Sequence, residues 1–389
     1  MTQYDVVIIG GGVIGSSIAY HLAAAGERSI LVLERDPTYS RASSALSASS
    51  IRQQFSNPTC IRMSQFSFQF MRDIDEHLGI DGQPAELPLL ERGYLYLADA
   101  AHSSALEAAI NVQKAHDVAV LRLDAAALER RFPWLNCADL EVGALGAAGE
   151  GWFDGYTLLQ AFRRKARQLG VVYAQDEAVD LIRCATRVRG VRTAAGAELG
   201  ADVVINAAGP HSASVAAWAG FALPVVPERR CIFTFSCPEV LDFIPLVIDP
   251  SGLYVRPEGH IFLAGGPATP VSGPDPLALD VDYGQFEDFI WPALAARIPA
   301  FERIKMTSAW AGHYEMNRFD HNALIGWTPG VEGLMLATGF SGHGMQHSPA
   351  AGRAVAELIT AGRFETLDLS ALSPERLVRN EPFVELNIV

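Results

Sequence analysis

The chain has 389 residues, of which 49% are apolar and 9% aromatic, so it can bury the cores of two or three domains. Its formal net charge of −14 disfavours nucleic acid and anionic membrane surfaces as partners. No uncharged apolar run reaches the ~18 residues that a membrane span needs. The five cysteines are scattered without metal-ligand or redox-pair spacing, so we expect buried thiols, no metal site and a cytoplasmic location.

The start of the chain predicts a nucleotide-binding β-α-β unit. Residues 4–9 form a short β-branched run that is too short for a helix and predicts a buried strand. A G-x-G-x-x-G motif follows over residues 10–15, and apolar residues at helical spacing come after it. A second strand is expected at residues 29–33, and it runs directly into Glu34. Strand, motif, helix, strand and acid in this order indicate a dinucleotide site.

Each residue of this unit has a physical role in such a site. Gly10 makes the tight turn, Gly12 lets a pyrophosphate approach the backbone, and Gly15 lets helix and strand pack closely. The helix N-terminus offers unpaired N–H groups to the phosphates, and Glu34 can accept hydrogen bonds from ribose hydroxyls. The alternative is an ordinary β-α-β unit with a glycine-rich turn.

The next segment consists almost entirely of small residues. Residues 40–50 are mostly serine and alanine, which predicts close backbone approach to a flat or extended ligand. A flexible linker is the alternative, but no charge run or proline repeat accompanies the segment. Arg52 follows it, and residues 60–78 carry apolar positions at helical spacing.

The middle of the chain alternates between helical and strand-like patterns. Up to residue 210 we expect a strand at 92–97, helices at 104–116 and 125–131, a turn at 151–155, a helix at 156–169, strands at 170–174, 178–184 and 187–193, and a buried parallel strand at 201–209. Residues 223–309 are rich in short strands and prolines, as in an antiparallel sheet, with one helix at 282–298. The remaining elements are strands at 229–235, 252–257, 260–265 and 334–339 and a helix at 342–359.

These landmarks resemble the FAD-dependent amine and amino-acid oxidoreductases, the D-amino-acid oxidase superfamily that includes glycine oxidase, monomeric sarcosine oxidase and the sarcosine oxidase β subunit. The matching stretches are residues 10–15 with Glu34, 43–52, 203–209 and, most specifically, Gly-Phe-Ser-Gly-His-Gly at 339–344. Residues 50–55, 151–154 and 314–320 are most similar to the branch of that β subunit and of the mitochondrial FAD oxidoreductase associated with complex I assembly.

The resemblance implies an α/β FAD-binding Rossmann-like domain of the glutathione reductase type and a smaller α+β substrate domain. A mainly antiparallel sheet in the substrate domain would cover the flavin. The FAD-binding domain would comprise residues 1–84, 141–220 and 318–389, and the substrate-binding domain residues 85–140 and 221–317.

The resemblance also implies which residues hold the cofactor. They are Gly10, Gly12, Val13, Ile14, Gly15, Glu34, Arg35, Ser43, Ser44, Ser49, Val179, Ala207, Ala208, Gly209, Gly339, Ser341, Gly342, His343, Gly344 and Met345. The helix that begins near Gly342 would direct its positive end at the flavin, unless it only packs there. The chain has one G-x-G-x-x-G motif, since residues 146–149 lack its first G-x-G, so electrons must come from the substrate rather than from NAD(P)H.

Candidate substrate residues are fewer. Arg52 could hold a carboxylate with its guanidinium fork, although a surface or phosphate-facing arginine is the alternative. Tyr254 and Arg256 alternate on one expected strand and could both face the cavity, or be ordinary sheet residues. His343 is a candidate catalytic base together with Arg52 and Tyr254, although a neutral amine needs no protein base.

Departures from the family pattern limit what the resemblance implies. Gly312 stands where sarcosine oxidase has its flavin-bonded cysteine, and no histidine occupies residues 40–50, so we expect one noncovalent, dissociable FAD per chain. Gln346 replaces a lysine, and an arginine of glycine oxidase is replaced around Tyr314, so a carboxylate site is rebuilt there or absent. No lysine lies in residues 250–275, which leaves oxidase and dehydrogenase both open.

The sequence therefore predicts a flavoprotein oxidoreductase, sarcosine oxidase-like, that oxidises the C–N bond of a small amino acid or N-substituted glycine. The resulting imine would be hydrolysed, and electrons would pass to O2 or to a protein or quinone acceptor. A 2-hydroxy-acid dehydrogenase, a non-catalytic flavoprotein assembly factor and a subunit of a heteromeric oxidase remain alternatives. A homo-oligomeric or heteromeric partner is also open.

Overall fold

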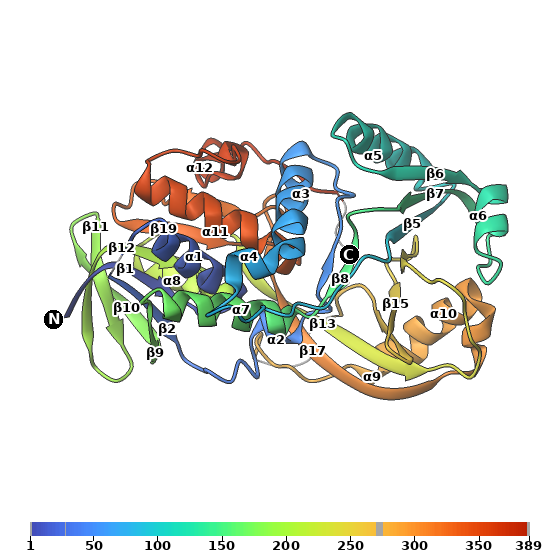
Figure 1. Cartoon of the computed structure of the whole chain (residues 1–389), viewed down its shortest axis with the longest axis horizontal. Helices are drawn as coiled ribbons and strands as arrows, with labels where there is room; N and C mark the ends of the chain where they lie inside the picture. The colour runs from blue at the N-terminus through green and yellow to red at the C-terminus, as the bar shows by residue number, and fades with distance from the viewer. Residues whose placement is uncertain (1, 28, 270–274, 387–389) are drawn as a thin grey trace.

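Two eight-stranded sheets lie side by side along the long axis of the molecule (Figure 1). The computed structural model describes residues 2–27, 29–269 and 275–386. Residues 1, 28 and 387–389 of the predicted FAD-binding domain, and residues 270–274 of the predicted substrate-binding domain, lie outside this description. The predicted fold class is confirmed, because one sheet is a largely parallel α/β layer of the Rossmann type and the other is mostly antiparallel.

The first sheet is built around the strand that precedes the glycine motif. Its strands are β1 (Thr2–Ile9), β2 (Ile30–Glu34), β9 (Val172–Gln175), β10 (Ala178–Cys184), β11 (Arg187–Thr193), β12 (Glu198–Asn206), β18 (Leu324–Trp327) and β19 (Leu334–Thr338). The order is β10-β11-β12-β1-β2-β9, with β19 beside β12 and β18 beside β19. The pairs β1–β12, β1–β2, β2–β9 and β12–β19 are parallel, so their carboxyl ends meet at one edge.

Apolar residues on both faces of β1 explain why this strand is central. Val6 and Ile8 pack under helices, while Val7 and Ile9 pack on the opposite face against the β10–β11 hairpin. Each of these side chains is buried, which contributes about 1.5–3 kcal/mol per residue. The helices of this half are α1 (Val13–Ala24), α3 (Pro58–Arg72), α4 (Ile74–Leu78), α7 (Gly155–Gln168), α8 (Ser212–Trp218), α11 (Gly344–Thr360) and α12 (Glu375–Arg379).

The second sheet has the order β17-β13-β16-β15-β14-β5-β7-β6. Its strands are β5 (Tyr94–Asp99), β6 (Val120–Asp124), β7 (Leu140–Gly146), β13 (Val225–Ser236), β14 (Leu246–Ile248), β15 (Tyr254–Glu258), β16 (Ile261–Gly265) and β17 (Lys305–Asn317). All neighbours are antiparallel except β14 and β5. Helices α5 (Ser103–Ala115), α6 (Ala125–Arg131), α9 (Tyr283–Gln285) and α10 (Trp291–Arg297) accompany it.

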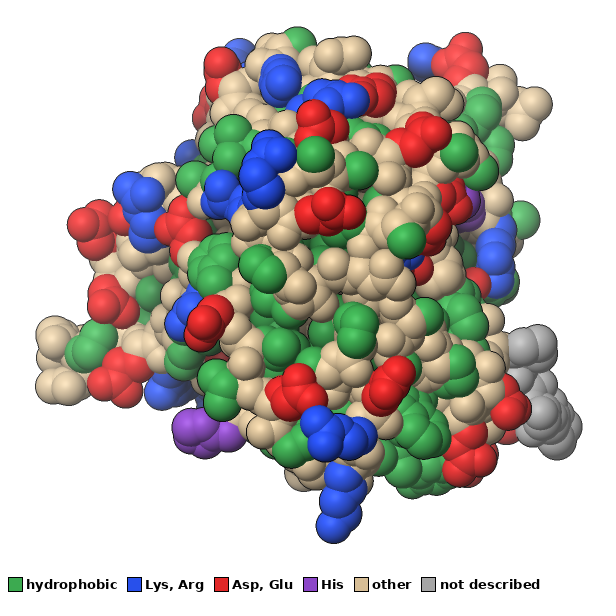
Figure 2. Space-filling model, turned by 90° about the vertical axis from the view of Figure 1, so that its right-hand side faces the viewer, with side chains coloured by type: hydrophobic (Ala, Val, Ile, Leu, Met, Phe, Trp, Pro, Cys, Tyr) green, Lys and Arg blue, Asp and Glu red, His purple; other side chains and the backbone are tan. Residues whose placement is uncertain are grey.

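The two faces of this second sheet have different neighbours. One face packs Phe233, Val255 and their neighbours against the helical segment that includes α10. The other face carries Tyr94, Ile232 and Tyr254 and is turned toward the first half of the molecule. At the outer end, acidic and basic side chains are interspersed with scattered apolar ones (Figure 2).

Short elements join the two halves. They are α2 (Ser43–Leu46), β3 (Ser50–Ile51), β4 (Leu89–Leu90), β8 (Gly151–Phe153) and the 3-10 turn Gly209–His211. Strands β3, β8 and β4 form a small third sheet, which brings the small-residue segment close to the turn into α7. None of the helices in the described part of the chain is both long and apolar enough to cross a bilayer.

Three sequence-based expectations differ from the structure. Residues 151–153, expected in a turn, form strand β8, whose partners β3 and β4 are far away in sequence. The expected helix at 282–298 is interrupted by a π-helical turn, Phe286–Ile290. Strand β7 pairs in the second sheet, although residues 141–146 fall in the segment predicted for the FAD-binding domain, so that boundary cuts through a strand. The domain boundaries themselves stay a prediction.

Candidate active site

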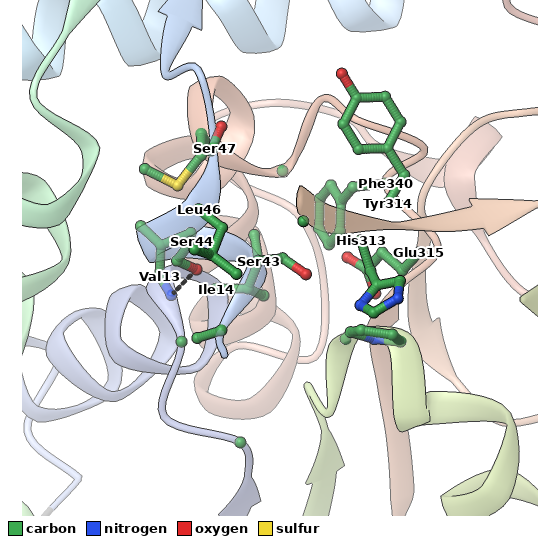
Figure 3. Close-up of a pocket in the computed structure, with 18 of the residues that line it drawn as sticks. Val13, Ile14, Ser43, Ser44, Leu46, Ser47, His313, Tyr314, Glu315 and Phe340 are labelled. Atoms are coloured by element: carbon green, nitrogen blue, oxygen red, sulfur yellow. Dashed lines mark hydrogen bonds between the residues drawn. The ribbon is translucent and has the colours of Figure 1, made fainter. Parts of the chain in front are cut away.

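One cavity of about 860 Å³ lies between the carboxyl edge of the first sheet and the face of the second. Figure 3 shows Ser43, Ser44 and Ser47 on one side of it and His313 and Tyr314 on the other. The β1–α1 turn, the end of β12, strand β17 and the start of α11 also contribute to its wall. The volume lies within the range of pockets that hold small ligands and cofactors.

The glycine motif forms the nucleotide end of the cavity, where Gly10 and Gly12 lie in the wall. Gly10 has φ +100°, and a Cβ there would lie 2.4 Å from the carbonyl oxygen of Ala207. A Cβ on Gly15 would lie 1.9 Å from the carbonyl oxygen of Gly10, so Gly15 permits close packing and does not itself line the cavity. The N–H of Val13 donates to Ser44 Oγ at 3.0 Å, which ties the start of α1 to the small-residue segment (Figure 3).

Glu34 lies at the end of β2, where the sequence predicted an acid for the ribose. Its Oε2 accepts the N–H of Gly11 at 2.9 Å, and its Oε1 accepts the N–H of Asp36 at 2.9 Å. Burial raises the pKa of Glu34, and these two hydrogen bonds oppose that shift. Arg35 also lines the cavity, and its Nη2 lies 2.7 Å from His211 Nε2.

The small-residue segment fits a flat or extended group. Ser43, Ser44 and Ser49 all line the cavity. The Ser43 hydroxyl oxygen is buried and has no hydrogen-bond partner within the described protein, so it is a polar atom oriented for a ligand. A Cβ on Gly12 would lie 3.2 Å from Ser44 Oγ, so a larger residue would crowd the small-residue segment here. These residues fit FAD.

The end of β12 and the start of α11 complete the predicted cofactor wall. Ala207, Ala208, Gly209, Val13 and Ile14 line the cavity, as do Gly342, His343, Gly344, Met345 and Gln346. Gly339 and Ser341 do not line it, because they shape the loop from behind: Gly339 has φ +72°, and the Ser341 N–H donates to the Glu315 carbonyl at 3.1 Å. Helix α11 has no acidic residue in its first turn, so its positive N-terminal end faces the cavity without a compensating charge on that turn.

Arg52 and His343 meet inside the cavity wall. Arg52 is 4% exposed, and its Nη2 lies 3.1 Å from His343 Nε2. A guanidinium only donates hydrogen bonds, so His343 Nε2 is the acceptor in this contact. The backbone N–H of Arg52 donates to Gln346 Oε1 at 2.9 Å, and the guanidinium lies 4.4 Å from the centre of the Phe55 ring. Arg52 is therefore held in position by packing, and Nε2 of His343 is committed to Arg52 rather than open as a base.

Tyrosines form the wall contributed by the second sheet. Tyr254 and Tyr314 line the cavity as predicted, and Tyr94 joins them. Burial raises the pKa of Tyr254 and raises the pKa of Tyr94 to about 12, so both are neutral hydroxyl donors at ordinary pH. The Tyr94 hydroxyl donates to Ser50 Oγ.

Two further predicted site residues do not line the cavity. Arg256 shares a strand face with Tyr254 but does not line the cavity; its guanidinium donates to the Ala48 carbonyl at 2.8 Å, pairs with Glu258 and lies over Trp152. It supports the loop instead. Val179 is 43% exposed and lies outside the cavity wall, while its neighbour Ala178 is inside. Successive strand residues face opposite ways, so the side chain of Val179 points away from the cavity. A contact of Val179 with the cofactor stays a prediction.

Several polar wall residues were not found from the sequence, among them Arg230, His313 and Glu315. Glu315 accepts a hydrogen bond from Thr338 Oγ1 at 2.7 Å, and burial raises the pKa of its carboxyl to about 7. His313 and Glu315 lie on β17, and Arg230 lies on its partner β13. Alternation along β17 gives no signal for His313 or Glu315, because both are direct neighbours of Tyr314 and successive strand residues face opposite ways. Nothing in the sequence therefore pointed to these residues.

The comparisons agree with this geometry. Residues 5–358 match the DAO family, described as FAD-dependent oxidoreductases. The chain belongs to this family. Membership implies FAD, a small-molecule substrate and an electron acceptor.

Individual relatives of this oxidoreductase family cover nearly the whole chain. "FAD-dependent oxidoreductase domain-containing protein 1" of Xenopus laevis is 43% identical, over 99% of this chain and 85% of its own length. Mouse mitochondrial sarcosine dehydrogenase is 27% identical over 93% of this chain, which corresponds to 40% of that longer protein. The crystal structure of L-proline dehydrogenase from P. horikoshii superposes with a TM-score of 0.86 at 25% identity, over 98% of this chain and 99% of that one.

Proposed function

We propose that this protein binds one noncovalent FAD per chain and oxidises the C–N bond of a small amino acid or N-substituted glycine. The observation that carries the proposal is the continuity of one cavity, from the glycine motif at Gly10 to the buried Arg52–His343 pair. Similarity to proteins named sarcosine dehydrogenase and L-proline dehydrogenase supports an amine with a carboxylate. FAD, when bound, supplies an acceptor for the hydride removed from the carbon next to nitrogen.

The residues of the chain would bind and orient the substrate. Arg52 offers a guanidinium fork to a carboxylate, and His343 and Phe55 fix its orientation before the substrate arrives. The neutral hydroxyl of Tyr254 lies in the same wall and can donate a hydrogen bond, whereas the Tyr94 hydroxyl already donates to Ser50 Oγ. A neutral amine has a free lone pair, so the reaction needs no protein base, which accords with the commitment of His343 Nε2 to Arg52.

The beginning of α11 would act on the charge that develops during reduction. Its first amides face the cavity at Gly344 and Met345, and they offer positive potential without proton transfer. Gly312 lines the cavity where sarcosine oxidase carries its cysteine, so no thiol is supplied there for a covalent bond.

A substrate panel tests the proposal. The holoprotein is mixed without oxygen with sarcosine, glycine, iminodiacetate, proline and D-amino acids, and flavin absorbance is followed. We expect bleaching by at least one amine. Rapid recovery in air with peroxide would indicate an oxidase, and persistent bleaching would indicate a dehydrogenase with a protein or quinone acceptor. Bleaching by 2-hydroxy acids alone, or by no small molecule, would refute the proposal in favour of a hydroxy-acid dehydrogenase or an assembly factor, respectively.

A further inference from the structure

The cavity contains a second, largely buried cation opposite the small-residue segment. Arg230 lies in the wall on β13, with 14% of its side chain exposed. Its cross-strand partner on β17 is Gly312, which has no side chain to cover the guanidinium. The guanidinium lies 5.0 Å from the centre of the Tyr314 ring, another wall residue. Arg230 is therefore a built part of the wall rather than a surface arginine.

Among the described residues, two protein contacts hold the η nitrogens of Arg230, and Nε remains without a protein partner. Nη1 donates to the carbonyl of Gly266 at 3.0 Å, and Nη2 lies 3.0 Å from Glu228 Oε1. Nε is buried and has no hydrogen-bond partner in the described protein. A guanidinium has five N–H groups in one plane, so Nε and the remaining hydrogens on the η nitrogens can still bind a carboxylate side-on.

The charge of Arg230 is not cancelled by Glu228. The other carboxylate oxygen of Glu228 is 2.7 Å from Nη2 of Arg318, whose side chain is 55% exposed. One carboxylate therefore serves two arginines, and the group of three carries a net charge of +1. The exposed member, Arg318, does not line the cavity, so the excess positive charge on the cavity side belongs to Arg230.

Arg230, Tyr254 and Tyr94 lie on strands β13, β15 and β5 of one sheet, in which the order is β13-β16-β15-β14-β5. Burial raises the pKa of Tyr254, and the charge of Arg230 opposes the shift. Burial raises the pKa of Tyr94 to about 12, and there the charge of Arg52 opposes it. The guanidinium of Arg52 lies 5.9 Å from the centre of the Tyr96 ring on β5, so Arg230 and Arg52 lie at opposite ends of this row of strands.

We propose that Arg230 forms a second anion-binding subsite, and that the amine oxidised carries two acidic groups, one held by Arg52 and one by Arg230. This inference rests on the proposed function for the role of Arg52. It names the substrate class as dicarboxylic amines. A substrate with a single carboxylate would leave the fork of Arg230 with only its structural partners in a partly desolvated wall.

Matched ligands that differ in one charge test the proposal. Iminodiacetate is compared with its monoamide, and unreactive dicarboxylates from malonate to adipate are compared with their monoamides, by the change in flavin absorbance of the holoprotein. The wild type should bind the best dicarboxylate about tenfold to a hundredfold more tightly than its monoamide. Arg230→Gln should abolish this preference, whereas Arg318→Gln, which removes the same charge from the other partner of Glu228, should keep it.

Each outcome decides the question. Equal binding of acid and amide by the wild type, or a preference that survives in Arg230→Gln, would overturn the proposal. If Arg230→Gln fails to retain FAD, Arg230→Lys replaces it, since lysine keeps the charge without the fork and should keep only part of the preference. Arg230-dependent binding of unreactive dicarboxylates without bleaching by any amine would support the subsite and refute the proposed C–N oxidation.

Discussion

Replacing Glu34 by glutamine tests the nucleotide end of the cavity. Each carboxylate oxygen of Glu34 accepts one backbone N–H at 2.9 Å and keeps further lone pairs for the ribose hydroxyls. The amide has one acceptor oxygen instead of two and no charge. A hydrogen bond to a charged group contributes about 1.5–3 kcal/mol and a neutral one about 0.5–1.5, so the change should cost about 1–3 kcal/mol of FAD binding. The dissociation constant of FAD should rise about 5-fold to 150-fold.

The assay is a titration of the apoprotein with FAD, followed by flavin fluorescence. Asp36→Asn is the matched control, because Asp36 also lines the cavity but its carboxylate accepts hydrogen bonds from Thr38 and Ser40 within its own turn. An unchanged FAD affinity in Glu34→Gln, or an equal loss in Asp36→Asn, would refute the assignment of Glu34 to the ribose.

Three further predictions concern stability and cofactor attachment. Asp320→Ala should lower the free energy of unfolding by about 3–5 kcal/mol, because it leaves Arg376 buried without its carboxylate partner (Nε–Oδ2 2.6 Å). The melting temperature should fall clearly. The control Glu365→Ala breaks an exposed pair with Arg363 and should leave the melting temperature unchanged. Burial raises the pKa of the fully buried Glu150 to about 7, above its unfolded value, so the stability that the protonated carboxyl contributes is full below pH ~4.5 and is lost as pH rises through 7. The free energy of unfolding of Glu150→Gln should therefore rise relative to that of the wild type by roughly 3 kcal/mol between pH 5 and 8, as measured by melting both proteins side by side. A difference between the two proteins that does not change with pH would contradict this prediction. Acid precipitation should release all FAD into the supernatant, and a yellow pellet would show a covalent bond.

Local sequence patterns predicted the N-terminal β-α-β unit well. The strand, motif, helix and acid from β1 to Glu34 appear where the sequence placed them, because this unit is set by short-range periodicity and glycine geometry. Strands β7 and β17 were not predicted, since glycines and polar residues interrupt their alternation. Their pairing partners, β5 and β13, lie tens of residues away and supply the order that the local sequence lacks.

The candidate site was predictable only where a motif or resemblance reached it. Arg52, Tyr254, Tyr314 and Gln346 do line one cavity. Arg230 was missed because nothing in its own segment distinguishes it from any other strand arginine; its role follows from the register that sets it opposite Gly312. Arg256 lies on the predicted face of its strand, but its guanidinium donates to the carbonyl of Ala48 in the neighbouring loop. Strand alternation cannot reveal such a tertiary contact. The roles of the site residues stay predictions.

The central claim is that a single nucleotide site holds FAD and that the electrons come from the substrate. The most direct measurement is to denature the purified protein and identify the released nucleotide by chromatography. We predict FAD at one per chain and no pyridine nucleotide, because the chain has a single G-x-G-x-x-G motif and its first residues, Gly10 and Gly12, line the described cavity. Tightly bound NAD(P) without flavin would contradict the account.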